Sequence, residues 1–112
     1  MRIRQLCLCP FRNFVRLDLD LGASGALIVG DNGRGKSNIL EAISYLSLGK
    51  SVRGARDGEA VPHDGDYFDI RGIWESVERQ RQARVFYSGN DGKNVFVDGV
   101  ALPRVSELVS QF

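Results

Sequence analysis

The chain has 112 residues, of which 43% are hydrophobic and 26% are charged. This is the size of one domain or part of one, and no stretch is apolar and long enough to predict a membrane span or a secretion signal. The net charge is only +1, but the first 56 residues carry nine Lys and Arg against four Asp and Glu. A basic first half favours a phosphate-bearing ligand, whereas the near-neutral whole argues against a protein that coats DNA.

Two strands are expected before residue 22. The first covers residues 2–8 and is ended by Pro10. Cys7 and Cys9 would lie two positions apart on one face of an extended strand, which is poor geometry for a disulfide between them, so reduced and partly buried thiols are predicted. Apolar and polar residues then alternate from 15 to 21, which predicts a second strand with one face in water.

A phosphate-binding loop is predicted next. Residues 26–29 form a short apolar run, typical of a buried parallel strand. The eight residues that follow match the pattern G-x-x-x-x-G-K-[ST]: Gly30, Asp31, Asn32, Gly33, Arg34, Gly35, Lys36 and Ser37. Glycines let main-chain N–H groups converge on a phosphate, the lysine brings a cation to the terminal phosphates, and the serine hydroxyl is placed to bind Mg²⁺. The pattern predicts a nucleotide site rather than an ordinary glycine turn.

A helix is expected to start at Lys36 and to stop at Gly49. Its N-terminus would present the positive end of the helix dipole to the phosphate. Apolar residues recur along it at helical spacing, with polar residues between them: Ile39, Leu40, Ile43 and Leu46, separated by Glu41, Ser44 and Ser47.

The remaining residues predict an antiparallel β-meander. Residues 51–66 have three glycines and no periodicity, which indicates an irregular connection. Alternation within 68–75 and 82–88, turn signals at 90–92 and 98–99, and an apolar run at 95–97 predict successive strands, with Trp74 on a buried face. The spacing of apolar residues from Val105 to Phe112 predicts a short final helix. We expect one unit over 1–112, made of parts 1–50, 51–66 and 67–112.

The sequence around the loop resembles a known family. The run from Gly30 to Ile43 is similar to the extended Walker A motif of SMC-like ATP-binding-cassette heads. In those heads an Asn precedes the second glycine, and an Asn-hydrophobic-hydrophobic-Glu-Ala-Ile run follows the Ser or Thr. Phe11-Arg12-Asn13-Phe14 resembles the signature that ends the first strand in the RecF family of this group, and segments 49–57, 70–72 and 94–108 keep its order and spacing. The chain is therefore similar to the N-terminal part of such a head, an α/β P-loop NTPase with an antiparallel β-meander.

The resemblance implies a set of ligands and partners. ATP and Mg²⁺ are the implied cofactors, with Ser37 on the metal, and Asn38, Arg12, Asn13 and Arg53 join Gly30–Ser37 in the implied nucleotide site. RecF-like heads form ATP-dependent homodimers, bind single-stranded or gapped DNA, and act with RecR and RecO to load recombinase, in the cytoplasm at the nucleoid. From the residues alone, Arg12 and Asn13 are better interpreted as an ordinary strand end, whereas Arg53 could equally be a solvated loop charge.

Hydrolysis of ATP needs groups that this sequence does not supply. Asp18 and Asp20 alternate with apolar residues and so do not form a Walker B pair, and no signature loop or glutamine-loop motif is recognisable. We expect ATP binding with little or no hydrolysis by this chain alone, and an exposed sheet edge and apolar surface that favour self-association. The alternatives are a non-catalytic nucleotide-binding fragment and a head fragment of another SMC-like ATPase. A small P-loop kinase is disfavoured because no lid arginines follow the loop.

Overall fold

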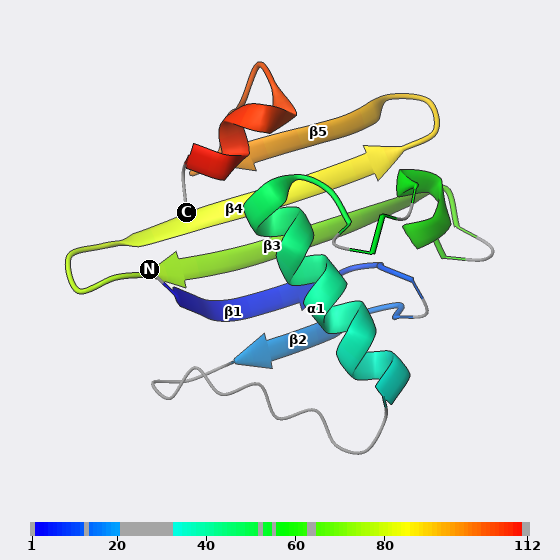
Figure 1. Cartoon of the computed structure of the whole chain (residues 1–112), viewed down its shortest axis with the longest axis horizontal. Coiled ribbons are helices and arrows are strands. Elements are labelled where there is room, and N and C mark those ends of the chain that lie inside the picture. Colours follow the sequence, from blue (N-terminus) through cyan, green and yellow to red (C-terminus); the bar gives the residue numbers. More distant parts are fainter. Residues whose placement is uncertain are drawn as a thin grey trace.

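The computed structural model describes residues 2–12, 14–20, 33–51, 53–54, 56–62 and 65–110, and only the main chain at positions 2, 33–36, 109 and 110. Within these ranges, one long helix crosses one face of a six-stranded sheet (Figure 1). The strands are β1 (Arg2–Leu8), β2 (Leu17–Asp20), β3 (Tyr67–Glu75), β4 (Gln80–Ser88), β5 (Gly92–Val97) and β6 (Val100–Ala101). The helix is α1 (Gly33–Leu48), and two short 3₁₀ helices are η1 (Asp57–Ala60) and η2 (Val105–Ser110).

The sheet has the order β2-β1-β3-β4-β5-β6, and each neighbouring pair is antiparallel. The strands from β3 to β6 form a meander, as the turn signals predicted. Gly92 (φ +73°) and Gly99 (φ +81°) take the left-handed conformation that these tight turns require. β1 joins the first part of the chain to this meander by pairing with β3, with Leu8 opposite Ile70.

The core lies between α1 and the sheet. Alternate residues of the strands point toward the helix and are buried: Leu6, Leu8, Phe68, Ile70, Trp74, Ala83, Val85, Val95 and Val97. At the centre, the rings of Phe11, Tyr45 and Phe68 pack with their centroids 5.2–6.0 Å apart. Burial of these side chains holds α1 on the sheet, because each buried large apolar side chain contributes about 1.5–3 kcal/mol.

Most predicted strands are confirmed. β1 has the expected bounds, and both cysteines near its end are half-buried and free. The second strand is shorter than expected, since β2 covers only 17–20 and the side chain of Val15 is 85% exposed. The predicted strand at 26–29 lies outside the described residues.

The helix begins earlier than the sequence predicted, at Gly33 rather than at Lys36. Gly33 and Gly35 lie in the first turn and not in the interior of the helix, which is where glycine is most costly. The predicted stop is confirmed. Gly49 has φ +75°, and its N–H donates to the carbonyl oxygen of Tyr45 at 2.9 Å, which is a common way for a helix to end.

The connection and the final helix are mostly as expected. The irregular connection contains only one short element among its described residues, η1. The final helix is a 3₁₀ helix, η2, in which Leu108 is buried and Val105 is half-buried. A spacing of three residues puts both side chains on one face of such a helix. Phe112 lies outside the described residues.

Candidate nucleotide-binding site

The predicted site residues cluster at the start of α1, as far as the structure describes them. The main chain of residues 33–36 forms the first turn of the helix, the side chain of Ser37 is exposed, and that of Asn38 is half-buried. Gly30, Asp31, Asn32 and Asn13 lie outside the described residues. The N-terminus of a 16-residue helix offers unpaired N–H groups and a positive dipole end, which suits an anion.

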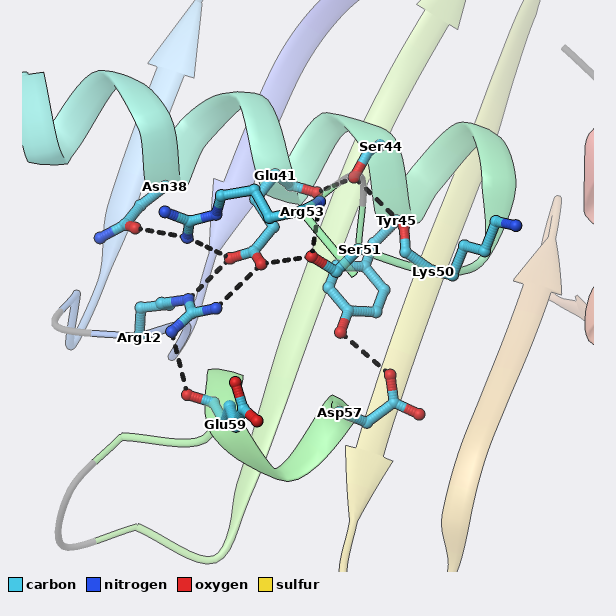
Figure 2. A network of polar contacts seen from close by, with 10 residues as sticks. All are labelled: Arg12, Asn38, Glu41, Ser44, Tyr45, Lys50, Ser51, Arg53, Asp57 and Glu59. Carbon is cyan, nitrogen blue, oxygen red and sulfur yellow. Dashed lines mark hydrogen bonds and ion pairs between the residues drawn. The ribbon is translucent and has the colours of Figure 1, made fainter. Parts of the chain in front are cut away.

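Glu41 is the centre of the polar contacts beside this turn. It lies four residues after Ser37 on α1, and its side chain is fully buried. Both carboxylate oxygens accept hydrogen bonds: Oε1 from Arg12 and Arg53, Oε2 from Arg12 and Ser51 (Figure 2). These donors come from the turn after β1 and from the loop after α1, so one carboxylate joins three segments of the chain.

Arg12 forms a bidentate ion pair with Glu41. Its Nε and Nη2 donate to the two carboxylate oxygens at 2.6 and 2.9 Å, and its Nη1 donates to the carbonyl oxygen of Glu59 at 3.2 Å. Arg12 has φ +53°, which is an uncommon main-chain conformation for a residue other than glycine. Its N–H donates to Ala60, so this turn is fixed against η1 by both main chain and side chain.

Arg53 reaches the same carboxylate from the other side. Its Nη2 donates to Glu41 at 2.8 Å and to the Oδ1 of Asn38 at 3.0 Å. The hydroxyl of Ser51 donates to Glu41 at 2.6 Å and accepts the N–H of Arg53 at 3.1 Å, so it bends the loop back toward α1. The structure therefore brings together three of the predicted residues, Arg12, Asn38 and Arg53, around one residue that was not predicted.

The surroundings of Glu41 keep it charged. Burial raises the pKa of its carboxyl, but hydrogen bonds from Arg12, Arg53 and Ser51 outweigh burial and hold the pKa at about 2. A buried carboxylate without such donors would be strongly unfavourable. The carboxylate and its two arginines therefore depend on one another.

A second polar contact fastens the loop after α1 further along the helix. The hydroxyl of Tyr45 donates to Asp57 at 2.9 Å, and the ammonium of Lys93 lies 3.1 Å from the same carboxylate. Burial, followed by the bond to Asp57, raises the pKa of Tyr45 well above its ordinary value. The phenol therefore stays protonated and continues to donate.

Glu41 and Ser51 are the residues that sequence reasoning missed. The helical spacing places Glu41 on the polar side of α1, yet it is buried, and Leu40, on the predicted apolar side, is 46% exposed. The sequence did contain a signal for Glu41, because it follows Ser37 by about one helical turn. A charged residue there lies on the same side of the helix as Ser37 and can face the same nucleotide. Without its distant partners, the sequence does not show that it is buried.

Other features of the described residues do not extend this site. Two hollows, of about 440 and 270 Å³, lie on the face of the sheet that carries Arg71 and Gln82, and neither is lined by a predicted site residue. No group of three or more His, Cys, Asp or Glu in the described part of the chain could hold a metal ion. No helix among these residues is both long and apolar enough to cross a membrane.

Comparison with known proteins gives a consistent family. The model of the AAA domain family matches residues 5–110. The DNA replication and repair protein RecF of Salinibacter ruber is 40% identical over 110 residues, which is 97% of this chain and 27% of that protein. RecF of Halalkalibacterium halodurans is 36% identical over 109 residues, 97% of this chain and 29% of that protein. The chain thus spans less than a third of the length of these curated relatives.

Solved structures agree with these matches. A structure of the recombination mediator protein RecF with ATP, from the RecFOR pathway, superposes with a TM-score of 0.86 at 33% identity, over 98% of this chain and 31% of that one. An SMC ATPase studied for ATP-driven dimerisation and DNA-stimulated activation superposes with a TM-score of 0.81 at 20% identity, over 98% of this chain and 76% of that one, which shows the fold alone. The expected fold and the likeness to the N-terminal region of RecF are confirmed.

Proposed function

The chain belongs to the AAA domain family, and from this premise we propose that it is the ATP-binding portion of a RecF-like DNA repair and recombination protein. The observation that carries the proposal is the position of the loop motif. Its last four residues before Ser37 form the first turn of α1, so the predicted phosphate loop leads directly into the positive end of a helix.

In this proposal, each part of the motif has a separate role. Main-chain N–H groups of Gly30–Ser37 hold the phosphates, and Asn32 shapes the loop. Lys36 supplies a cation, and the exposed hydroxyl of Ser37 is a suitable ligand for the Mg²⁺ that accompanies ATP. Asn13, Asn38 and Arg53 complete the site as contacts to the nucleotide, and Arg12 belongs to it through its ion pair with Glu41. The bonds of Arg12, Asn38 and Arg53 beside the start of α1 support their inclusion.

Titration of the folded chain with ATP and Mg²⁺ in a calorimeter tests the proposal. Lys36→Ala should weaken binding about tenfold or more, because a charge-assisted contact to phosphate is lost. Lys50→Ala is the matched control, because Lys50 is an exposed lysine just beyond the other end of α1. This variant should bind ATP like the unchanged chain. Absence of binding by the folded chain, or equal affinity of the Lys36→Ala variant, would contradict the proposal.

We further propose that this chain alone hydrolyses ATP little or not at all. Phosphoryl transfer to water needs a carboxylate near the metal and a group that orients the water, and the sequence offers no Walker B strand to supply them. A phosphate-release assay on the unchanged chain and on Lys36→Ala separates a slow ATPase from a non-catalytic nucleotide-binding fragment. Robust turnover that depends on Lys36 would overturn this expectation.

The remaining parts of the proposal concern the longer protein of which the relatives are examples. There we propose an ATP-dependent homodimer that binds single-stranded or gapped DNA and acts with RecR and RecO in loading recombinase, in the cytoplasm at the nucleoid. The similarity to RecF supports these partners. Sedimentation of the longer protein with gapped DNA, RecR and RecO, with and without ATP, would test them.

A further inference from the structure

Glu41 has a role beyond filling a place in the core. We propose that Glu41 is a positioning residue, which holds Arg53 beside the first turn of α1 so that its guanidinium can meet the phosphates of a bound nucleotide. The inference rests on the proposed ATP site and adds a residue to it. It assigns different tasks to the two arginines on the carboxylate, one as counter-charge and the other as ligand contact.

Arg12 is the counter-charge. A carboxylate with no exposed surface must be paired and hydrogen-bonded to stay charged. Arg12 meets this need with two bonds to Glu41, and its remaining terminal nitrogen is bonded to the carbonyl oxygen of Glu59. Because Nε, Nη1 and Nη2 are all engaged and the side chain is only 22% exposed, Arg12 has little freedom to turn toward a ligand.

Arg53 is differently placed. Glu41 and Asn38 hold it through Nη2 alone, and its side chain is 42% exposed. Among the described residues, Nε and Nη1 of Arg53 have no hydrogen-bond partner. A guanidinium held at one nitrogen can still donate two bonds from the others, so Arg53 can bind an oxyanion without leaving Glu41.

The position along α1 matches this task. Ser37 and Glu41 are four residues apart, which is about 6 Å along a helix axis. Arg53 lies over the helix between Asn38 and Glu41, on the side that leads toward the first turn (Figure 2). Three bonded side chains, Arg12, Arg53 and Glu41, carry a net charge of +1, so the cluster still attracts an anion after the carboxylate is neutralised.

Glu41 contributes to binding by ordering Arg53 before the nucleotide arrives. A free arginine loses rotamer entropy when it is fixed, and a ligand that meets an already fixed side chain avoids part of this loss. Ser51 supports the same arrangement through its bonds to Glu41 and to the N–H of Arg53. Loss of the carboxylate should therefore weaken nucleotide binding through Arg53.

A double-mutant cycle tests this route. ATP with Mg²⁺ is titrated into the unchanged chain, Glu41→Gln, Arg53→Ala and the double variant, and thermal unfolding of each reports stability separately. Glu41→Gln and Arg53→Ala should each weaken ATP binding about tenfold, as expected for loss of a contact to a charged group. In the double variant, affinity should equal that of Arg53→Ala alone, because Glu41 has nothing left to position.

Equal effects of Glu41→Gln in both backgrounds would overturn the inference, since the residue would then act through the fold in general. If Glu41→Gln does not fold, Ser51→Ala takes its place in the cycle, because it removes the hydroxyl that bonds both Glu41 and the N–H of Arg53 and is not a proposed contact to the nucleotide. Additive effects of Ser51→Ala and Arg53→Ala would also overturn the inference. An Arg53→Ala variant that binds ATP normally would end the inference but leave the ATP site intact. Loss of the site itself would instead show as no binding by the unchanged chain, or as no effect of Lys36→Ala.

Discussion

At the scale of single residues, Glu41 and Asp69 each place a carboxylate inside the fold between two arginines. Glu41 bonds Arg12 and Arg53, whereas Asp69, which is 4% exposed, accepts two bonds from Arg84 at 2.9–3.0 Å and one from Arg71 at 3.1 Å. Removal of one partner from such a group leaves an uncompensated charge, which is more destabilising than loss of a surface ion pair. The two clusters therefore restrict the structures that the chain can adopt.

Glu41→Gln should make the stability of the protein less sensitive to acid. The pKa of Glu41 is about 2 in the folded chain, against an ordinary value of 4.5 that applies when the chain is unfolded. Because the folded value is the lower one, the carboxylate stabilises the fold above about pH 4.5, and this stabilisation is lost as the pH falls toward 2. The difference corresponds to about 3 kcal/mol at most.

Urea unfolding at about pH 6 and about pH 3 measures this difference. The unchanged chain should lose more free energy of unfolding between the two pH values than Glu41→Gln does. Glu78→Gln, a change of an exposed carboxyl in the turn between β3 and β4, should behave like the unchanged chain. Identical losses in the unchanged chain and in Glu41→Gln would show that this carboxyl does not have a lowered pKa.

The residues of the site could be predicted only in part. The loop motif and the family resemblance pointed to Arg12, Asn38 and Arg53, whose side chains do meet. Glu41 was missed because its burial depends on Arg12, 29 residues earlier, and on Arg53, 12 residues later. Periodicity within a helix shows which residues share a side, but not which distant charges will cover that side.

At the scale of elements, α1 and β3 approach closely where β3 has a glycine. A Cβ atom at Gly72 would lie 2.5 Å from Cδ1 of Leu46 on α1 and 3.5 Å from Cδ1 of Ile3 on β1. Leu46 is fully buried and so has little room to move. The glycine therefore sets how near the helix lies to the sheet.

Gly72→Ala should lower the free energy of unfolding by about 1–3 kcal/mol, as expected when a methyl group is forced into a packed core. Gly89→Ala is the control, because a Cβ atom at this turn position meets nothing within 4 Å, and it should change stability by less than about 0.5 kcal/mol. Chemical unfolding of both variants measures the difference. Equal stability of the two would mean that α1 can move off the sheet without loss.

Elements were easier to predict than their limits. Alternation in β3, β4 and β5 and the glycine turns between them were visible in the sequence, because a sheet with one covered face imposes a period of two. The start of α1 was not, since glycine and arginine neither favour nor forbid a first turn. The sequence also predicted an exposed Glu41 and a buried Leu40, whereas the structure shows the opposite. The reason is the same as for the missed site residue: ion pairs with distant segments cover Glu41.

At the scale of the whole molecule, the sheet contains strand pairs that are neighbours in the sequence and pairs that are far apart in it. Pairing of β3, β4, β5 and β6 follows from short turns and could be expected. The placement of β1 between β2 and β3 requires contacts across most of the chain, such as that between Leu6 and Gly72. No pattern within a strand encodes its distant neighbour, so the sequence predicted a meander but not the complete sheet.

Exposed apolar side chains on α1 predict that the chain self-associates. Leu40 and Leu48 are 46% and 38% exposed on a helix whose other side is covered by the sheet. When another surface covers these side chains, apolar area is removed from water, and this stabilises the contact by about 25 cal/mol per Å². Light scattering should therefore show a mass that rises with protein concentration.

The double variant Leu40→Gln and Leu48→Gln should weaken this association about tenfold or more while leaving thermal stability nearly unchanged, because exposed side chains contribute little to the core. Val77→Gln is the matched control, since Val77 is fully exposed in the turn between β3 and β4, far along the chain from α1. It should associate like the unchanged chain. A monodisperse monomer at high concentration would show that these leucines do not form a contact surface, and an equal effect of Val77→Gln would show that association follows general hydrophobicity rather than α1.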